Sequence, residues 1–261
     1  MLMCLRYTIS GAALLLGARL RGAQFPSRDQ AGRTALYGVI TIGLGTGSLA
    51  FAEQWIPSGL AALIVSVQPF WMTGMEALQG ERLHPAALRG MLVGLAGVIF
   101  LIAPSLAGGT GIRAGDLIGG FLLLQFGAAM WSVGSSLQRR LPTRAHPFVS
   151  GGVQQLATGL AFAIPALVGA DHAVWNFKGM AAVLYLAVFG GIVGYSAYIF
   201  ALDRLPVALV SIYTYINPLV AVVLGYLFYR EAFGWREAVA VIIIFIGVAM
   251  VKAASSKTGP A

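Results

Sequence analysis

The sequence predicts an all-α integral membrane fold with nine transmembrane helices in two inverted repeats. Three observations support this prediction. Of the 261 residues, 58% are hydrophobic and only 10% are charged, whereas soluble domains contain about 25% charged residues. Several uninterrupted apolar stretches reach about 20 residues, the length that crosses a bilayer as a helix. The halves of the chain also share one pattern at an offset of about 150 residues, a sign of internal duplication. A transmembrane β-barrel is excluded, because its strands would alternate apolar and polar residues.

Each predicted span is an apolar segment followed by a short polar or basic loop. The first segment contains Arg6 and is followed by Arg19 and Arg21, which favours a retained span over a cleaved signal peptide. The nine segments are 2–18, 34–54, 57–79, 87–104, 116–136, 148–169, 179–202, 206–228 and 236–252.

The basic residues predict the orientation of these spans. If the loop 19–33 is cytoplasmic, twelve Lys or Arg residues lie inside and four lie outside, as the positive-inside rule requires. The C-terminus is then cytoplasmic. The inside set is Arg19, Arg21, Arg28, Arg33, Arg82, Arg89, Arg139, Arg140, Arg144, Arg204, Lys252 and Lys257, and the outside set is Arg113, Lys178, Arg230 and Arg236.

The internal repeat aligns IPSGLAALIVSVQPFWMTGMEALQGERL (56–83) with LPVALVSIYTYINPLVAVVLGYLFYREAF (205–233). The two prolines of each stretch are 12 residues apart, and a glutamate follows the second proline after 12 or 13 residues. The aligned positions are Pro57 with Pro206, Gln68-Pro69 with Asn217-Pro218, Glu81 with Glu231, Gly45 with Gly194, and Gly97-Val98 with Gly247-Val248.

The repeat predicts two units of unequal size. Residues 2–104 hold four spans and residues 116–252 hold five, because the span 116–136 has no counterpart in the first unit. With five spans in a complete unit, an odd number, the second copy enters the membrane upside down relative to the first.

These motifs resemble the drug/metabolite transporter superfamily, and in particular its paired EamA-type domains. The resemblance covers residues 1–105 as a first repeat of four helices, and residues 106–261 as a second repeat of five helices with a short cytoplasmic tail. It implies a ten-helix fold, here without its first helix, with a central cavity between the repeats. We expect an in-frame upstream extension of about 20 apolar residues if the start is misplaced.

Gln68 and Asn217 are the first candidate pathway residues. Each follows the starting proline of its span by 11 residues, which is about 16 Å along a helix and halfway through the apolar core. Pro69 and Pro218 are expected to kink these two helices beside the amides. Either the amides line the pathway or they hydrogen-bond neighbouring helices.

Other polar and aromatic side chains are candidates for the same pathway. Arg6 is an ionisable group within a span, which suits an anionic or carboxylate substrate, although it could also reach the headgroups from the outer end of its span. The aromatic residues could instead anchor the protein at the membrane interface. The remaining candidates are Gln125, Trp131, Tyr195 and Tyr213.

Several functions are excluded by what the sequence lacks. It has no nucleophile elbow, zinc-protease motif or phosphate-binding loop, and its three histidines lie in different loops. We therefore expect no enzyme activity, no cofactor and no metal. The net charge of +8 reflects topology, because the basic loops lack the aromatic residues of a nucleic-acid surface.

The sequence thus predicts a multi-pass protein of the cell (inner) membrane. It would transport a small organic metabolite or drug, with export as the direction that the resemblance implies, by alternating access through the central cavity. The alternative is a non-transporting truncated copy or a membrane interaction protein. The partners are the substrate and the lipid bilayer, and both a monomer and a homodimer remain open.

Overall fold

The computed structural model describes residues 1–56, 58–80, 84–107, 113–142, 145–169, 176–217, 220 and 234–255, and these residues form helices and their connections without any strand. The predicted all-helical class is confirmed to that extent. Three continuous helical stretches are long and apolar enough to cross a membrane by length and composition: Arg28–Ala52, Ala114–Arg140 and Phe177–Arg204. The count of nine spans and the inverted repeats remain predictions.

The chain forms two compact units. Unit 1 contains Met1–Gly47 and Val133–Arg204, and unit 2 contains Ser48–Ser132 and Leu205–Ala261. Each unit therefore combines segments from both predicted repeats. The repeat boundaries remain a prediction.

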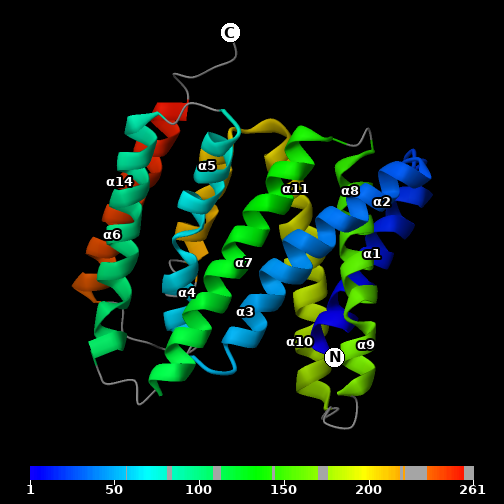
Figure 1. The fold of residues 1–261 in the computed structure, drawn as a ribbon, viewed down its shortest axis with the longest axis horizontal. Helices are drawn as coiled ribbons and strands as arrows, with labels where there is room; N and C mark the ends of the chain where they lie inside the picture. Colours follow the sequence, from blue (N-terminus) through cyan, green and yellow to red (C-terminus); the bar gives the residue numbers. More distant parts are fainter. Residues whose placement is uncertain are drawn as a thin grey trace. The chain divides into compact units, whose positions relative to one another are not determined.

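Unit 1 is built around a close contact between α1 and α8, which lie side by side in Figure 1. A Cβ added to Gly11 would lie 2.4 Å from the Leu156 backbone N, and one added to Gly159 would lie 2.6 Å from that of Thr8. Small residues thus let the two backbones touch. The helices of unit 1 are α1 (Leu2–Leu20), α2 (Arg28–Gly38), η1 (Val39–Thr46), the C-terminal part of α7 (Ala114–Arg140), α8 (Pro147–Ala161), α9 (Ala163–Val168), α10 (Phe177–Tyr185), η3 (Leu186–Tyr195) and α11 (Ser196–Arg204).

Two π-helical segments occupy matching places in the sequence repeat. When Gly45 is aligned with Gly194, the last residue of η1, Thr46, corresponds to Tyr195, the last residue of η3. A π-helix is rare and often occurs near functional sites. The two halves thus share an unusual local backbone as well as a residue pattern.

Unit 2 contains a break between α4 and α5. The turn at residues 66–67 separates them, and Pro69 lies in the first turn of α5, where its missing N–H costs little. Pro218, which the sequence predicts as the second kink, lies outside the described residues, as do Pro57, Glu81 and Glu231. The helices of unit 2 are α3 (Gly47–Ala52, whose first residue falls in unit 1), α4 (Ser58–Val65), α5 (Gln68–Leu78), α6 (Pro85–Ala107), the N-terminal part of α7, α12 (Val207–Ser211) and α14 (Trp235–Ser255).

The longest contact in unit 2 joins α6 and α14 (Figure 1). A Cβ added to Gly247 would lie 2.5 Å from the Gly94 backbone N, so the helices meet through glycines. Tyr215 fills the space beside them, because its ring lies 2.8 Å from the Cβ position of Gly94 and its hydroxyl donates to the Met91 carbonyl at 2.9 Å.

Candidate functional site

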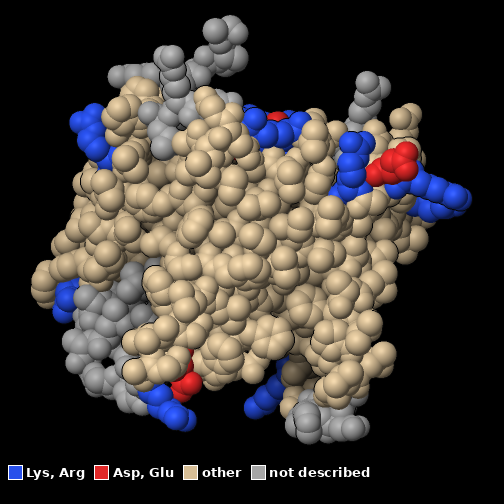
Figure 2. All heavy atoms as spheres, in the orientation of Figure 1, with Lys and Arg blue, Asp and Glu red and all other residues tan. Residues whose placement is uncertain are grey.

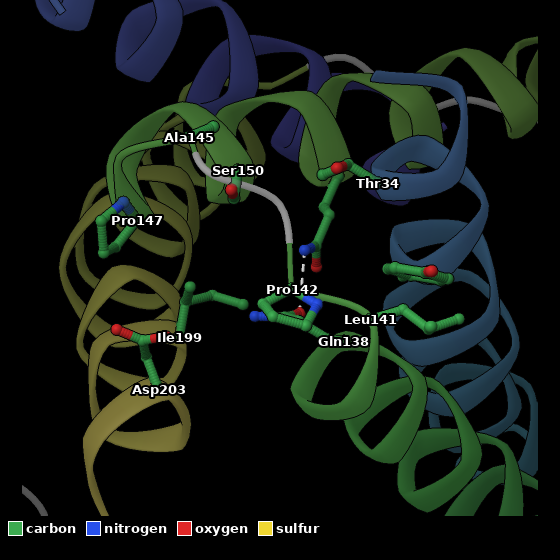
Figure 3. A pocket seen from close by; sticks show the side chains of 11 residues that line it. Thr34, Gln138, Leu141, Pro142, Ala145, Pro147, Ser150, Ile199 and Asp203 are labelled. Carbon is green, nitrogen blue, oxygen red and sulfur yellow. Dashed lines mark hydrogen bonds between the residues drawn. The ribbon is translucent and has the colours of Figure 1, made fainter. Parts of the chain in front are cut away.

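A pocket of about 260 Å³, called the amide pocket below, lies in unit 1 at the ends of α2, α7, α8 and α11 (Figure 3). In the predicted topology all four of these helix ends face the cytoplasm. Its lining mixes amides and hydroxyls with prolines and small apolar residues, and Asp203 is its one acidic side chain. The lining residues are Thr34, Tyr37, Gln138, Leu141, Pro142, Ala145, Pro147, Ser150, Gln154, Ile199 and Asp203.

Gln154 holds together the inner side of this pocket. It is fully buried, and its Nε2 donates to the Gln138 Oε1 at 2.9 Å, the bond drawn dashed in Figure 3. Its Oε1 accepts from the Tyr195 hydroxyl at 2.5 Å. The Tyr195 ring stacks on Tyr198, with 5.9 Å between the centroids, and the Tyr198 hydroxyl lies 2.5 Å from the Ser135 Oγ. Four helices thus share one polar network inside an apolar unit.

Tyr37 carries the one pocket-lining hydroxyl that is buried without a hydrogen-bond partner among the described residues. The residue is 4% exposed and lines the pocket from α2. One helical turn further, the Thr41 Oγ1 is also buried without a partner. Buried polar groups are nearly always paired. Tyr37 thus lines the pocket while its hydroxyl lacks the bond that a buried polar group usually forms.

The next residue of α8, Gln155, carries a second bonded amide. Gln155 is also fully buried; its Oε1 accepts from the Ser10 Oγ at 2.5 Å and its Nε2 donates to the Gly191 carbonyl at 3.1 Å. It therefore joins α8 to α1 and to η3. Both amides are thus bonded at both ends to neighbouring helices. They differ in that Gln154 lines the pocket, whereas Gln155 is not among its described lining residues.

Arg6 lies deeper in unit 1 than its position near the start of α1 suggests. Its Nη2 would lie 2.6 Å from a Cβ on Gly190, which is midway along the continuous stretch Phe177–Arg204. The sequence places Arg6 near the outer end of its span, but α1 begins partway along its neighbours. The Arg6 Nε is buried without a partner, and the guanidinium lies 4.8 Å from the Tyr7 ring centroid. An ionised group in such surroundings favours an anionic ligand.

Gln68, the first predicted pathway residue, is 3% exposed in unit 2. Its Nε2 donates to the Ala128 carbonyl at 3.1 Å and to the Ser132 Oγ at 3.0 Å, both on α7. The amide N–H groups therefore tie α5 to α7. This contact is the helix-to-helix role that the sequence leaves open beside the pathway role.

The other predicted pathway residues of unit 2 have different surroundings. Gln125 is half-buried and accepts from the Trp71 Nε1 at 2.8 Å on an exposed surface. Trp131 and Tyr213 are half-buried, and Asn217 is exposed. Gln68 and Asn217, which match in the repeat, thus have different surroundings. Of the seven pathway candidates, Arg6 and Tyr195 lie in unit 1 and the rest in unit 2.

Sequence reasoning misses three amides. Gln138 and Gln154 line the pocket, and Gln155 is the next residue of α8. A signal for two of them was present, because adjacent glutamines inside the apolar segment 148–169 are as unusual as Asn217-Pro218. Gln138 gives no such signal, since it lies beside Arg139 and Arg140 at the end of its helix.

Within the described part of the chain, no group of three or more His, Cys, Asp or Glu residues could hold a metal ion.

Comparison with known proteins identifies relatives over nearly the whole chain. The EamA-like transporter family matches residues 1–103 and 118–253. The "Uncharacterized inner membrane transporter YedA" of Escherichia coli (strain K12) is 31% identical over 252 residues, covering 94% of this chain and 79% of that protein.

Two further similarities concern a named exporter and a solved fold. The "Aromatic amino acid exporter YddG" of Ancylobacter novellus is 31% identical over 153 residues, 58% of this chain and 52% of that protein. A crystal structure superposes with a TM-score of 0.81 at 23% identity, covering 98% of this chain and 88% of the other. That likeness shows the fold.

Proposed function

The chain belongs to the EamA-like transporter family, and we propose that it exports a small organic solute with a carboxylate group by alternating access. Its relatives are transporters and not enzymes. The observation that carries the proposal is the pocket of unit 1, where the buried Tyr37 hydroxyl has no partner among the described residues and the Gln154 network forms the inner side. A solute held there would complete the hydrogen bonds of the pocket.

The direction and mechanism rest on the predicted topology and on family likeness. The pocket lies at helix ends that are predicted to be cytoplasmic, so a solute would enter it from inside the cell. Two relatives carry the printed names "Aromatic amino acid exporter YddG" and "Probable terminal-alkyne amino-acid exporter". Hydrogen bonds from Gln154 to α7 and η3 lie at the pocket. Alternating access requires that such contacts between helices open and close in turn.

The variant Tyr37→Phe tests the pocket. Burying this hydroxyl without a hydrogen bond destabilises the folded protein, so its removal should leave the melting temperature unchanged or raise it. The affinity for the solute should fall about fivefold, because one hydrogen bond of about 1 kcal/mol is lost. The measurement is efflux of a labelled amino-acid and metabolite panel from cells with and without the protein. Tyr185→Phe is the control, because Tyr185 is 57% exposed. Unchanged efflux in Tyr37→Phe across all transported solutes would exclude the pocket as the binding site.

Arg6 does not line the pocket but lies beside Gly190, deeper in unit 1. It therefore tests the substrate class at a second point of the proposed route. Arg6→Gln should lower efflux of amino acids about tenfold or more, since a hydrogen bond to a charged group contributes about 1.5–3 kcal/mol, and it should spare the corresponding decarboxylated amines. Arg6→Lys retains the charge and should retain part of the activity. Equal loss for acids and amines would contradict the carboxylate assignment while leaving transport itself intact. Absence of efflux for every solute in the unmodified protein would instead contradict the proposed function.

A further inference from the structure

A second cavity of unit 1 is an apolar groove of about 580 Å³ between α1 and the η3–α11 segment. One wall follows α1 at roughly one-turn spacing and ends at Arg21, and the other follows η3 and α11 and ends at Phe200. Phe148 of α8 closes one side. The lining residues are Ala13, Leu14, Gly17, Ala18, Arg21, Phe148, Ile192, Val193, Ser196, Ala197 and Phe200.

Positive charge gathers at one end of the groove. Arg21 lines it directly, and the Arg204 guanidinium lies 3.6 Å from the centroid of the Phe200 ring. Neither arginine forms a salt bridge with a described carboxylate, and Asp203 lines the amide pocket instead. In the predicted topology both arginines lie on the cytoplasmic side. Figure 2 shows charged side chains at the ends of the helices of unit 1 and an uncharged surface along them.

One residue of the groove wall carries a buried hydroxyl without a described partner. Ser196 is 4% exposed and lines the groove, and its Oγ has no hydrogen-bond partner among the described residues. Ser196 lies one helical turn from Phe200, about 6 Å deeper along the helix axis. A ligand with an anionic head, an acceptor one turn below it and an apolar tail would match all three features.

We propose that this groove binds one anionic phospholipid, with its phosphate between Arg21 and Arg204, an ester carbonyl accepting from Ser196, and an acyl chain along Gly17 and Ala13. Basic sites between transmembrane helices on the cytoplasmic side attract acidic headgroups. The inference concerns a lipid and does not depend on the transported solute. A free anion would use only the two arginines and would leave the apolar length of the groove empty.

Native mass spectrometry of the purified full chain tests the proposal. The protein is titrated with dioleoyl phosphatidylglycerol or with dioleoyl phosphatidylcholine, and bound lipid is counted. We expect a preference for phosphatidylglycerol that falls about fivefold in Arg21→Gln and similarly in Arg204→Gln, at roughly 1 kcal/mol per basic residue near a membrane surface. Arg19→Gln, on the same helix end but outside the groove, should keep the preference. Equal binding of both lipids, or an equal loss in Arg19→Gln, would overturn the proposal.

Filling the groove tests the acyl-chain part separately. A Cβ at Gly17 would meet no atom within 4 Å, so Gly17→Leu should fold normally and abolish the phosphatidylglycerol preference. Gly115→Leu is the control, because its Cβ position is also open and Gly115, on α7, is not among the residues that line the groove. Retained lipid preference in Gly17→Leu would show that no chain occupies the groove, and the proposal would fail.

Discussion

The buried amides Gln68, Gln154 and Gln155 all hydrogen-bond neighbouring helices, and Gln154 also lines a cavity. Gln68 and Gln155 are buried and donate to a neighbouring helix or π-helix. Gln154 is equally buried but lines the amide pocket. The partners of these amides are alike, since each is bonded to neighbouring helices as buried polar groups usually are. Access to the pocket is what distinguishes Gln154.

Replacement of Gln68 by Leu tests how much its hydrogen bonds between α5 and α7 stabilise the protein. Loss of two buried hydrogen bonds of about 1 kcal/mol each should lower the melting temperature of the purified protein. Gln125→Leu is the control, because its bond to Trp71 lies on an exposed surface, and its effect should be smaller.

Gln68 and Asn217 also retain their predicted pathway role as a separate hypothesis. If Gln68→Leu and Asn217→Leu both keep full efflux with an unchanged substrate preference, that hypothesis is wrong. A changed preference at an unchanged melting temperature would support it.

At the scale of elements, unit 1 depends on glycines that let α1 meet α8. Gly11 lies against the Leu156 backbone, whereas Gly17, on the same helix, faces the open groove. Glycine therefore allows a close contact between helices at one position and lines an open groove at the other. The sequence pattern alone does not separate the two roles.

Gly11→Ala should destabilise the protein by about 1–3 kcal/mol, because the added methyl group overpacks the contact. Gly17→Ala is the matched control and should be neutral or stabilise by up to about 1 kcal/mol, since alanine favours the helix. Thermal unfolding of the two purified variants in one detergent makes the comparison. A melting temperature of Gly11→Ala equal to that of Gly17→Ala would contradict the close α1–α8 contact.

At the scale of the whole molecule, the basic loops predict which helix ends face the cytoplasm. Arg139 lies in the last turn of α7 and Lys178 in the first turn of α10. The positive-inside rule predicts that they lie on opposite sides of the membrane. In this predicted orientation the amide pocket and the arginine end of the groove would face the cytoplasm.

Cysteine labelling tests this orientation. The chain has one cysteine, Cys4, so Cys4→Ser provides a background without thiols. In that background Lys178→Cys should react with a membrane-impermeant maleimide in spheroplasts, and Arg139→Cys should react only after the cells are opened. The reverse pattern would invert the topology and with it the proposed side of solute entry.

The sequence by itself determined the helical membrane class and the family, because apolar length, basic loops and the repeat are properties of the chain read in order. It did not identify Gln138, Gln154 and Tyr37 as neighbours, since residues from three helices share a pocket only after those helices pack. The depth of Arg6 and the different surroundings of Gln68 and Asn217 have the same cause. Hydropathy requires that helices enter the membrane, whereas close contacts between glycines decide which side chains meet inside it.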